Sequence, residues 1–208
     1  MDRILLASAS PRRAELLRAA GVAFDLFAPE IDESLRDCEE PADRVLGLAE
    51  DKARAAALLS PSSSPRLALG ADTLVCLPGQ LAGEAEVALG KPANRAEAGR
   101  MMRLISGRPH LVRTGLALLD RSTGRVTLSR SDSTVSFSQM SEGEIEAYLD
   151  AGEWAGVAGG YRIQGLAALF IDRLEGSWSG VVGLPMRELY VMLLAAGYRV
   201  PPRPSTGG

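Results

Sequence analysis

The sequence has 208 residues and contains few of those that most often carry metal or redox chemistry. Its two cysteines, Cys38 and Cys76, lack C-x-x-C spacing, and His110 is its single histidine. These residues are too few for a zinc site built from cysteine and histidine. A histidine-based catalytic triad would depend on His110 alone.

The chain also lacks an excess of positive charge and a long apolar run. With 23 Lys and Arg against 26 Asp and Glu, its net charge is −3. This charge argues against a general nucleic-acid-binding surface, so any anion recognition must be local. No apolar run reaches about 18 residues, and the start does not resemble a signal segment. We therefore expect a cytoplasmic protein that binds neither nucleic acid nor membranes.

The chain does contain ample material for a folded core. Apolar residues make up 46% of it, which is enough for one large α/β domain or two small lobes that share a core. From Pro201 onward the sequence is rich in Pro, Gly and Ser. We predict a single domain over residues 1–199 and a disordered C-terminal tail over residues 200–208.

The first strand and helix of the chain form a potential anion-binding unit. The apolar run Ile4–Ala7 predicts a buried strand, and Ser10 followed by Pro11 is a typical helix start with Ser10 as N-cap. The unpaired N–H groups of a helix start favour an anion. Arg12 and Arg13 add positive charge where a helix disfavours it. A negative ligand would explain this arrangement, and two solvated arginines are the alternative.

Hydrophobic spacing predicts alternating helices and strands along the rest of the chain. Pro41 begins a helix that contains Lys52, and Asn94 and Ser141 are expected N-caps of two more helices. A last helix starts at the segment 183–185. The predicted strands cover residues 22–27, 67–75, 111–119, 125–137 and 167–171. This pattern indicates an α/β fold.

Asp72 stands inside one of these apolar strands. Burying a carboxylate is costly unless it is paired or holds a metal, so this residue needs a reason to be there. We favour a functional role for Asp72 over a structural hydrogen bond. Gly70, two residues earlier, lets another group approach the backbone closely.

Three other features supply possible binding groups. Lys52 lies beside Glu50 and Asp51, and a solvated, locally paired lysine is its simplest interpretation. Lys91 is held on a stiff turn between glycine and proline. The segment 159–165 has three glycines around an aromatic residue, which favours backbone packed against a flat ligand over an ordinary loop. Its Gln164 could pair with the edge of a uracil or thymine base.

Taken together, these groups suit a triphosphate. Cationic side chains hold phosphates and neutralise the charge that develops as a P–O bond breaks. Carboxylates hold a divalent cation or take a proton from water.

Six segments resemble the motifs of one protein family. They are LASASPRR (6–13), EDKA (50–53), GADT (70–73), LGKP (89–92), GGYRIQG (159–165) and VVGLP (181–185). Any one is weak, but all six in this order resemble the Maf family of nucleotide pyrophosphatases, from Ile4 to about Ala196. The resemblance implies a two-lobed Maf/ITPase-like α/β fold. In that fold a long mixed β-sheet is flanked by helices and the active site lies in the cleft.

The resemblance also implies an activity. Such proteins hydrolyse nucleoside triphosphates to the monophosphate and pyrophosphate with a divalent cation, Mg²⁺ or Mn²⁺. The expected partner is therefore a nucleoside triphosphate substrate, and the resemblance suggests a homodimer.

Roles are implied residue by residue. Asp72 matches the proton acceptor that activates water, and Asp72 and Glu33 are the candidate metal ligands. The implied phosphate-binding residues are Ser8, Arg13, Lys52 and Lys91. The positions that separate the branch acting on dTTP and UTP from the branch acting on 7-methyl-GTP are Arg12, Thr73 and Gln164.

The chain departs from the family pattern in two places. After Trp154 it has Gly156 and Val157 where an Asp-Lys pair is usual, which would remove a phosphate contact or a structural ion pair. The segment 78–86, just before Lys91, is longer than expected and would reshape the cleft rim.

The function that we expect is hydrolysis of dTTP and UTP, extending to modified pyrimidine triphosphates. The alternative is a nucleotide-binding regulator of cell division or septum formation with little or no catalysis.

Overall fold

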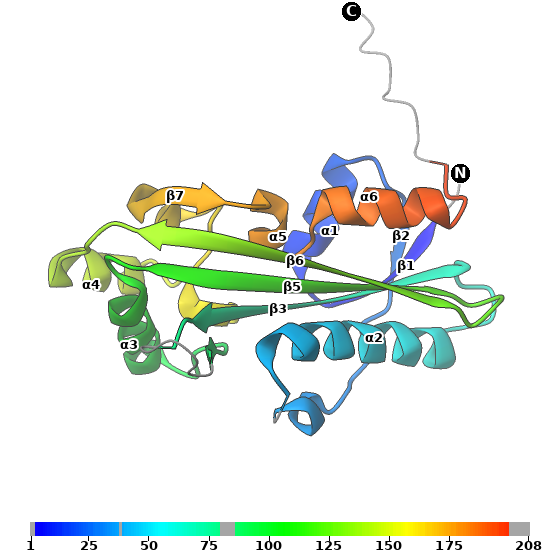
Figure 1. The fold of residues 1–208 in the computed structure, drawn as a ribbon, viewed down its shortest axis with the longest axis horizontal. Helices are drawn as coiled ribbons and strands as arrows, with labels where there is room; N and C mark the ends of the chain where they lie inside the picture. Colours follow the sequence, from blue (N-terminus) through cyan, green and yellow to red (C-terminus); the bar gives the residue numbers. More distant parts are fainter. Residues whose placement is uncertain (1–2, 38, 80–85, 200–208) are drawn as a thin grey trace, which may run out of the picture.

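The computed structural model describes residues 3–37, 39–79 and 86–199. Its strands form one mixed sheet in the order β2-β1-β3-β5-β6-β7, and β4 also pairs with β3 (Figure 1). The strands are β1 (Ile4–Ala7), β2 (Phe24–Leu26), β3 (Leu67–Leu77), β4 (Val87–Leu89), β5 (Pro109–Asp120), β6 (Val126–Phe137) and β7 (Ile171–Glu175). The prediction of an α/β fold with a long mixed sheet is confirmed.

Helices cover this sheet. The α-helices are α1 (Pro11–Ala19), α2 (Pro41–Leu59), α3 (Arg95–Ile105), α4 (Glu142–Asp150), α5 (Trp178–Val182) and α6 (Met186–Ala195). The 3₁₀ helices are η1 (Glu33–Arg36), η2 (Ala158–Gly160) and η3 (Leu166–Phe170). In Figure 1, α2 lies along one face of the sheet, and α1 and α6 lie on the other.

Side chains of β1 alternate between these two faces. Leu5 packs in a cluster with Ala49 of α2, whereas Ile4 packs in a cluster with Leu17 of α1 and Leu189 of α6. Successive residues of a strand point to opposite faces, so a strand covered on both is apolar throughout. Because β1 is covered on both faces, all four of its residues are apolar and buried.

The sheet changes direction at β3. This strand is parallel to β1 and antiparallel to β5. The pairing with β1 ends at Gly70, opposite Ala7, and the pairing with β4 begins at Val75. Between those points, in the described part of the chain, residues 71–74 have no strand partner on that edge. The carboxyl end of β1 opens into this gap, and in α/β sheets such a place favours ligand binding.

Two glycines let α2 lie directly on the sheet. A Cβ atom at Gly70 would be 2.0 Å from the carbonyl oxygen of Ala49, and one at Gly115 would be 2.3 Å from that of Val45. The prediction that Gly70 admits a close approach is confirmed, and the group that approaches is the backbone of α2. This contact fixes the height of α2 above β3.

A second core region lies at the other end of the sheet. There α3 and α4 pack through Met102, Ile105 and Tyr148 in a cluster that includes Phe137 of β6. The caps predicted for α3 and α4 are both confirmed. Asn94 accepts a hydrogen bond from the backbone N–H of Glu97 at 3.0 Å, and Ser141 forms a capping box with Glu144.

One local prediction holds only in part, and another is wrong. Ser10 precedes α1 as predicted, but its side chain makes no capping hydrogen bond. Residues 167–171 were predicted as a strand, yet most of them belong to η3, and β7 begins at Ile171. A short apolar run does not distinguish a strand from a helical turn. Here a backbone hydrogen bond from Leu166 to the carboxylate of Glu153, at 2.8 Å, holds the turn.

Two predictions concern segments that the structure does not describe. The expected tail at 200–208 lies outside the described residues, as does the part of segment 78–86 that spans 80–85. The single-domain boundary at residue 199 stays a prediction. None of the helices in the described ranges has the length and apolar character needed to cross a bilayer.

Candidate active site

A cavity of about 380 Å³ lies at the gap in the edge of β3. Ligand sites in proteins are typically of this size or larger. Its wall includes all nine residues that the sequence analysis assigned to the site, namely Ser8, Arg12, Arg13, Glu33, Lys52, Asp72, Thr73, Lys91 and Gln164. The structure therefore brings together every one of the predicted positions.

Asp72 and Thr73 reach this cavity from opposite faces of β3. Asp72 contacts Lys52 of α2, while Thr73 contacts Thr114 and Arg13 on the other face. Adjacent strand residues normally have separate surroundings. Both line one cavity here because the edge of β3 is open between β1 and β4.

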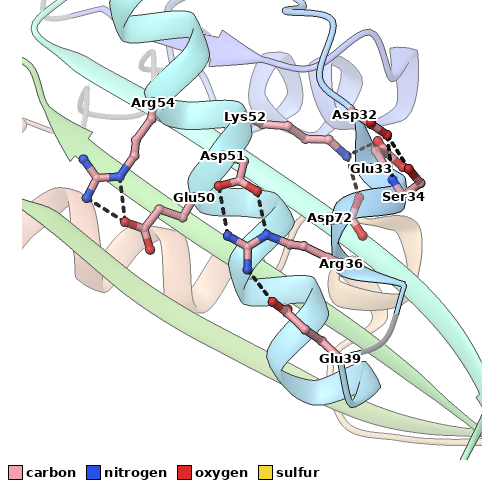
Figure 2. Close-up of polar contacts among 10 residues, drawn as sticks. All are labelled: Asp32, Glu33, Ser34, Arg36, Glu39, Glu50, Asp51, Lys52, Arg54 and Asp72. Atoms are coloured by element: carbon pink, nitrogen blue, oxygen red, sulfur yellow. Dashed lines mark hydrogen bonds and ion pairs between the residues drawn. The ribbon is translucent and has the colours of Figure 1, made fainter.

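Lys52 joins two carboxylates on the α2 side (Figure 2). Its Nζ lies 2.6 Å from Oδ1 of Asp72 and 2.7 Å from Oε1 of Glu33. The side chains of Lys52 and Asp72 are only 13% and 10% exposed. The interpretation of Lys52 as a solvated lysine paired with a helix neighbour is therefore wrong. Buried charges need this kind of pairing, since an unpaired one costs several kcal/mol.

The same contact lowers the pKa of Glu33. Partial burial raises this pKa, but the hydrogen bond and charge of Lys52 lower it, and the charges of Lys91 and Arg44 add to that effect. The net result is a pKa below the ordinary value for glutamate. Glu33 is thus held in its ionised form beside the two lysines.

A salt-bridge network fixes η1, which carries Glu33, against α2 (Figure 2). Arg36 at the end of η1 donates from Nε and Nη2 to the two carboxylate oxygens of Asp51, at 2.6 and 3.0 Å. It also donates from Nη1 to Glu39 at 2.8 Å. Paired bonds of this type define direction as well as distance. Arg36 therefore helps to hold Glu33 over Lys52.

Arg13 is the cation of the other face. Its guanidinium donates to Oγ of Ser8 at 2.9 Å, to the carbonyl oxygen of Gly183 at 2.8 Å and to Oγ1 of Thr73 at 3.3 Å. Burial lowers its pKa, and Arg12 lowers it further, whereas Asp72 and Glu33 raise it. An arginine stays charged through shifts of this kind. Arg13 is therefore a partly buried, oriented positive charge that interacts electrostatically with Asp72.

The hydroxyl hydrogen of Thr73 is used in a hydrogen bond within the protein, whereas that of Ser8 is available to a ligand. Thr114 donates to the carbonyl oxygen of Gly180 at 2.8 Å, so the hydrogen between Thr73 and Thr114, 3.0 Å apart, comes from Thr73. Ser8 accepts from Arg13 and from the backbone N–H of Ser10 at 3.2 Å. Among the described residues its own O–H has no acceptor, which leaves it to donate to a phosphate oxygen.

The glycine-rich segment forms the far wall of the cavity. The N–H of Gly159 donates to the carbonyl oxygen of Gly90 at 3.0 Å, which ties this segment to the turn that carries Lys91. Gly159 has φ +68, and a Cβ there would be 2.8 Å from Val75, so only glycine fits. Gln164 is exposed on this wall, and its side chain forms no hydrogen bond with the described residues.

Comparisons with known proteins cover nearly the whole chain. A family model described as Maf-like protein covers residues 3–196. The chain belongs to the Maf family. Curated relatives named dTTP/UTP pyrophosphatase share its length. One from Geobacter metallireducens is 43% identical and covers 94% of this chain and 97% of its own. One from Desulforamulus reducens is 41% identical, at 96% and 100%.

A further relative of the same name, from Treponema denticola, is 40% identical and covers 96% of this Maf protein and 100% of its own chain. A solved structure of a nucleoside-triphosphatase / dITP/XTP pyrophosphatase from Mycobacterium abscessus matches with a TM-score of 0.37 and 18% identity. It covers 66% of this chain and 74% of its own. A TM-score this low carries no argument about the fold or the activity.

The donor set of this Maf protein fits a divalent cation shared with a substrate. Glu33 and Asp72 place oxygens within 2.7 Å of one nitrogen, so a small cation could reach both. The described residues hold no cluster of three or more acidic, histidine or cysteine side chains that could form a complete site. Magnesium is commonly held by one or two carboxylates together with phosphate oxygens and water. Glu33 and Asp72 would therefore be the side chains that hold such a cation.

Several residues around the Maf site escaped the sequence analysis. Arg36 and Thr114 lie outside the quoted motifs, and no local pattern separates them from ordinary helix and strand residues. His110 was considered only as a triad member, but it is buried and lies 2.8 Å from the hydroxyl of Tyr161. Arg162 was quoted within GGYRIQG but not singled out. Its alternation with Gln164 was the signal that both face the cavity.

Proposed function

We propose that this Maf protein hydrolyses dTTP and UTP, and modified pyrimidine triphosphates, to the monophosphate and pyrophosphate. The observation that carries the proposal is one cavity in which Asp72 meets cationic side chains from both faces of β3. The names of its full-length relatives support the substrate class.

The proposed phosphate-binding groups carry a positive charge or an available hydrogen-bond donor. Lys52 and Lys91 lie near the carboxylates, and Arg13 and Ser8 lie across the gap. Each supplies donors to a chain of phosphate oxygens. Because Arg13 is already fixed by three acceptors, it keeps its orientation when the ligand arrives. Such preorganised charge stabilises a transition state at little cost in reorganisation.

Asp72 is the proposed proton acceptor. Its Oδ1 is held by Lys52, and its other oxygen has no hydrogen-bond donor among the described residues. A water molecule that hydrogen-bonds to this oxygen would attack phosphorus and transfer a proton to the carboxylate. The P–O bond between the α and β phosphates breaks, and pyrophosphate leaves with the bonding electrons. General-base help of this kind contributes about 10²–10⁴ in rate.

The proposal includes Mg²⁺ or Mn²⁺ held by Asp72 and Glu33. When bound, the metal would neutralise phosphate charge and polarise P–O bonds.

We assign substrate specificity to Arg12, Thr73 and Gln164, and Gln164 is the one of the three that would contact the base. Gln164 offers an amide that can donate to one base carbonyl and accept from the ring N–H of uracil or thymine. Its exposure on the cavity wall leaves that amide accessible. Thr73 would act indirectly. Its hydroxyl accepts a hydrogen bond from Arg13 and donates one to Thr114, so it orients Arg13.

Location and assembly complete the proposal. Nucleoside triphosphates are made and used in the cytoplasm, so we place the enzyme there, as a homodimer. Sedimentation velocity would test the dimer directly.

A substrate panel tests the proposed activity. UTP, dTTP, CTP and 7-methyl-GTP would be incubated with Mg²⁺ or Mn²⁺, and pyrophosphate and orthophosphate measured separately. We expect pyrophosphate from UTP and dTTP, at rates well above those for the other two nucleotides. No release from any nucleotide would favour the nucleotide-binding regulator of cell division, and orthophosphate alone would indicate a general phosphatase.

A further inference from the structure

Arg162 is a cation of the cavity wall that the proposed mechanism leaves without a role. It lies on the segment between η2 and η3, two residues before Gln164, and its neighbours Tyr161 and Ile163 are buried. Arg162 itself is half-buried and lines the cavity. Side chains alternate here, so those of Arg162 and Gln164 share the exposed side.

The hydrogen-bonding state of Arg162 is unusual for an arginine in this position. Its Nε is buried without a partner, and its guanidinium forms no ion pair with the described residues. Arginine carries five N–H donors, and a buried donor left unmade costs about 1–3 kcal/mol. By contrast, Arg13 on the opposite wall is held by three acceptors.

A second arginine, Arg12, lines the same cavity as Arg162. Burial lowers the pKa of Arg12, and the positive charge of Arg162 lowers it further, against a smaller opposing effect of Glu15. The positive charge of Arg162 therefore destabilises the charged form of Arg12. An anion between them would replace this repulsion with two attractions.

We propose that Arg162 is a further substrate-binding residue that, with Arg12, holds a phosphate group of the nucleotide. Two guanidinium groups supply the forked donors that suit phosphate oxygens. A neutral base edge would not offset the repulsion between two full charges. The phosphate is therefore the part of the ligand that fits.

This inference rests on the proposed function, so its test uses binding without turnover. The probes are inorganic pyrophosphate and UMP, titrated calorimetrically into wild type, Arg162→Ala and Arg162→Lys, with uridine titrated as the phosphate-free ligand. Arg100→Ala is the matched control, because Arg100 is exposed, lies 3.8 Å from Glu97 and does not line the cavity. Thermal unfolding confirms that each variant is folded.

We expect Arg162→Ala to weaken the binding of pyrophosphate or UMP about tenfold or more, in line with the loss of a charge-assisted contact. Arg162→Lys should recover part of the affinity, and Arg100→Ala should match wild type. The KM for UTP should rise in Arg162→Ala, with a smaller change in kcat.

Unchanged affinity of Arg162→Ala for both phosphate ligands would overturn the inference. An equal loss for uridine and UMP would do so too, because it would mean that Arg162 contacts the nucleoside or merely shapes the wall. If the wild type released no pyrophosphate from any triphosphate, the proposed function would fail while this anion-binding test could still be carried out.

Discussion

At the scale of single residues, Lys52 is central because one nitrogen serves two carboxylates. Its Nζ contacts both Asp72 and Glu33. The sequence predicted an unusual Asp72 from its apolar neighbours, yet Lys52 looked like an ordinary surface lysine. The difference arises from tertiary structure, since Lys52 becomes buried only when α2 lies on β3. The residues next to Lys52 in the sequence do not indicate that contact.

His110 provides a test at the same scale, since it is the single histidine of the chain. Burial lowers its pKa to about 4, whereas an unfolded histidine titrates near 6.5. Between these values the unfolded chain binds a proton that the folded protein excludes. The free energy of unfolding should therefore fall as pH drops from 6.5 to 4, by up to about 3 kcal/mol. Above pH 6.5 this contribution is fully present.

Urea unfolding at pH 7.0, 5.5 and 4.5 measures this effect. Comparison with His110→Gln isolates the histidine from the carboxylates, which titrate in the lower part of the same range. The ring protons of the one histidine also give its pKa directly by NMR. A folded-state pKa near 6.5, or the same pH dependence in His110→Gln, would contradict the assignment.

At the scale of elements, the site depends on where strands stop. β1 ends opposite Gly70 and β4, which runs the other way, ends opposite Val75, so the edge of β3 is open at Asp72 and Thr73. Strand positions and helix caps were largely predictable, because periodicity and capping residues are local signals. The gap was not, because it depends on the registers of three strands. The wrong prediction of a strand at residues 167–171 also comes from a contact that is distant in sequence. The carboxylate of Glu153 accepts a hydrogen bond from the backbone N–H of Leu166 and holds the helical turn there.

Gly70→Ala tests how α2 is positioned. The new Cβ would be 2.0 Å from the carbonyl oxygen of Ala49, so α2 must move and carry Lys52 away from Asp72. We expect the free energy of unfolding to fall by roughly 3 kcal/mol, together with a loss of pyrophosphatase activity. Thermal unfolding and UTP hydrolysis measure the two effects.

Gly143→Ala is the matched control for this substitution. Gly143 lies in α4 with open space around its Cβ position, so alanine there should raise stability by about 0.5–1 kcal/mol. If Gly70→Ala were as stable and active as wild type, the contact between α2 and β3 would not position the site.

At the scale of the whole molecule, the sheet gathers groups that are distant in sequence. The cavity is lined by residues from the end of β1, the open edge of β3, the elements α1, α2 and η1, and the segment that follows η2. The membership of this set was predictable because the motifs of the Maf family mark it. That Asp72 and Thr73 share one cavity was not predictable, since adjacent strand residues lie on opposite faces and normally have separate surroundings.

In the proposed mechanism, Asp72 takes the proton from water inside this cavity. Asp72→Asn keeps the shape of the side chain, and Lys52 keeps Glu33 as a partner, so the variant should fold and bind UMP like wild type. Asp150→Asn, at an exposed carboxylate of α4, makes the same chemical change outside the site.

The decisive measurement is kcat for pyrophosphate release from UTP by wild type and these two variants. We expect a fall of about a hundredfold or more for Asp72→Asn, and no change for Asp150→Asn. A kcat for Asp72→Asn within a few fold of the wild-type kcat, with UMP binding intact, would contradict the role of Asp72 as the proton acceptor.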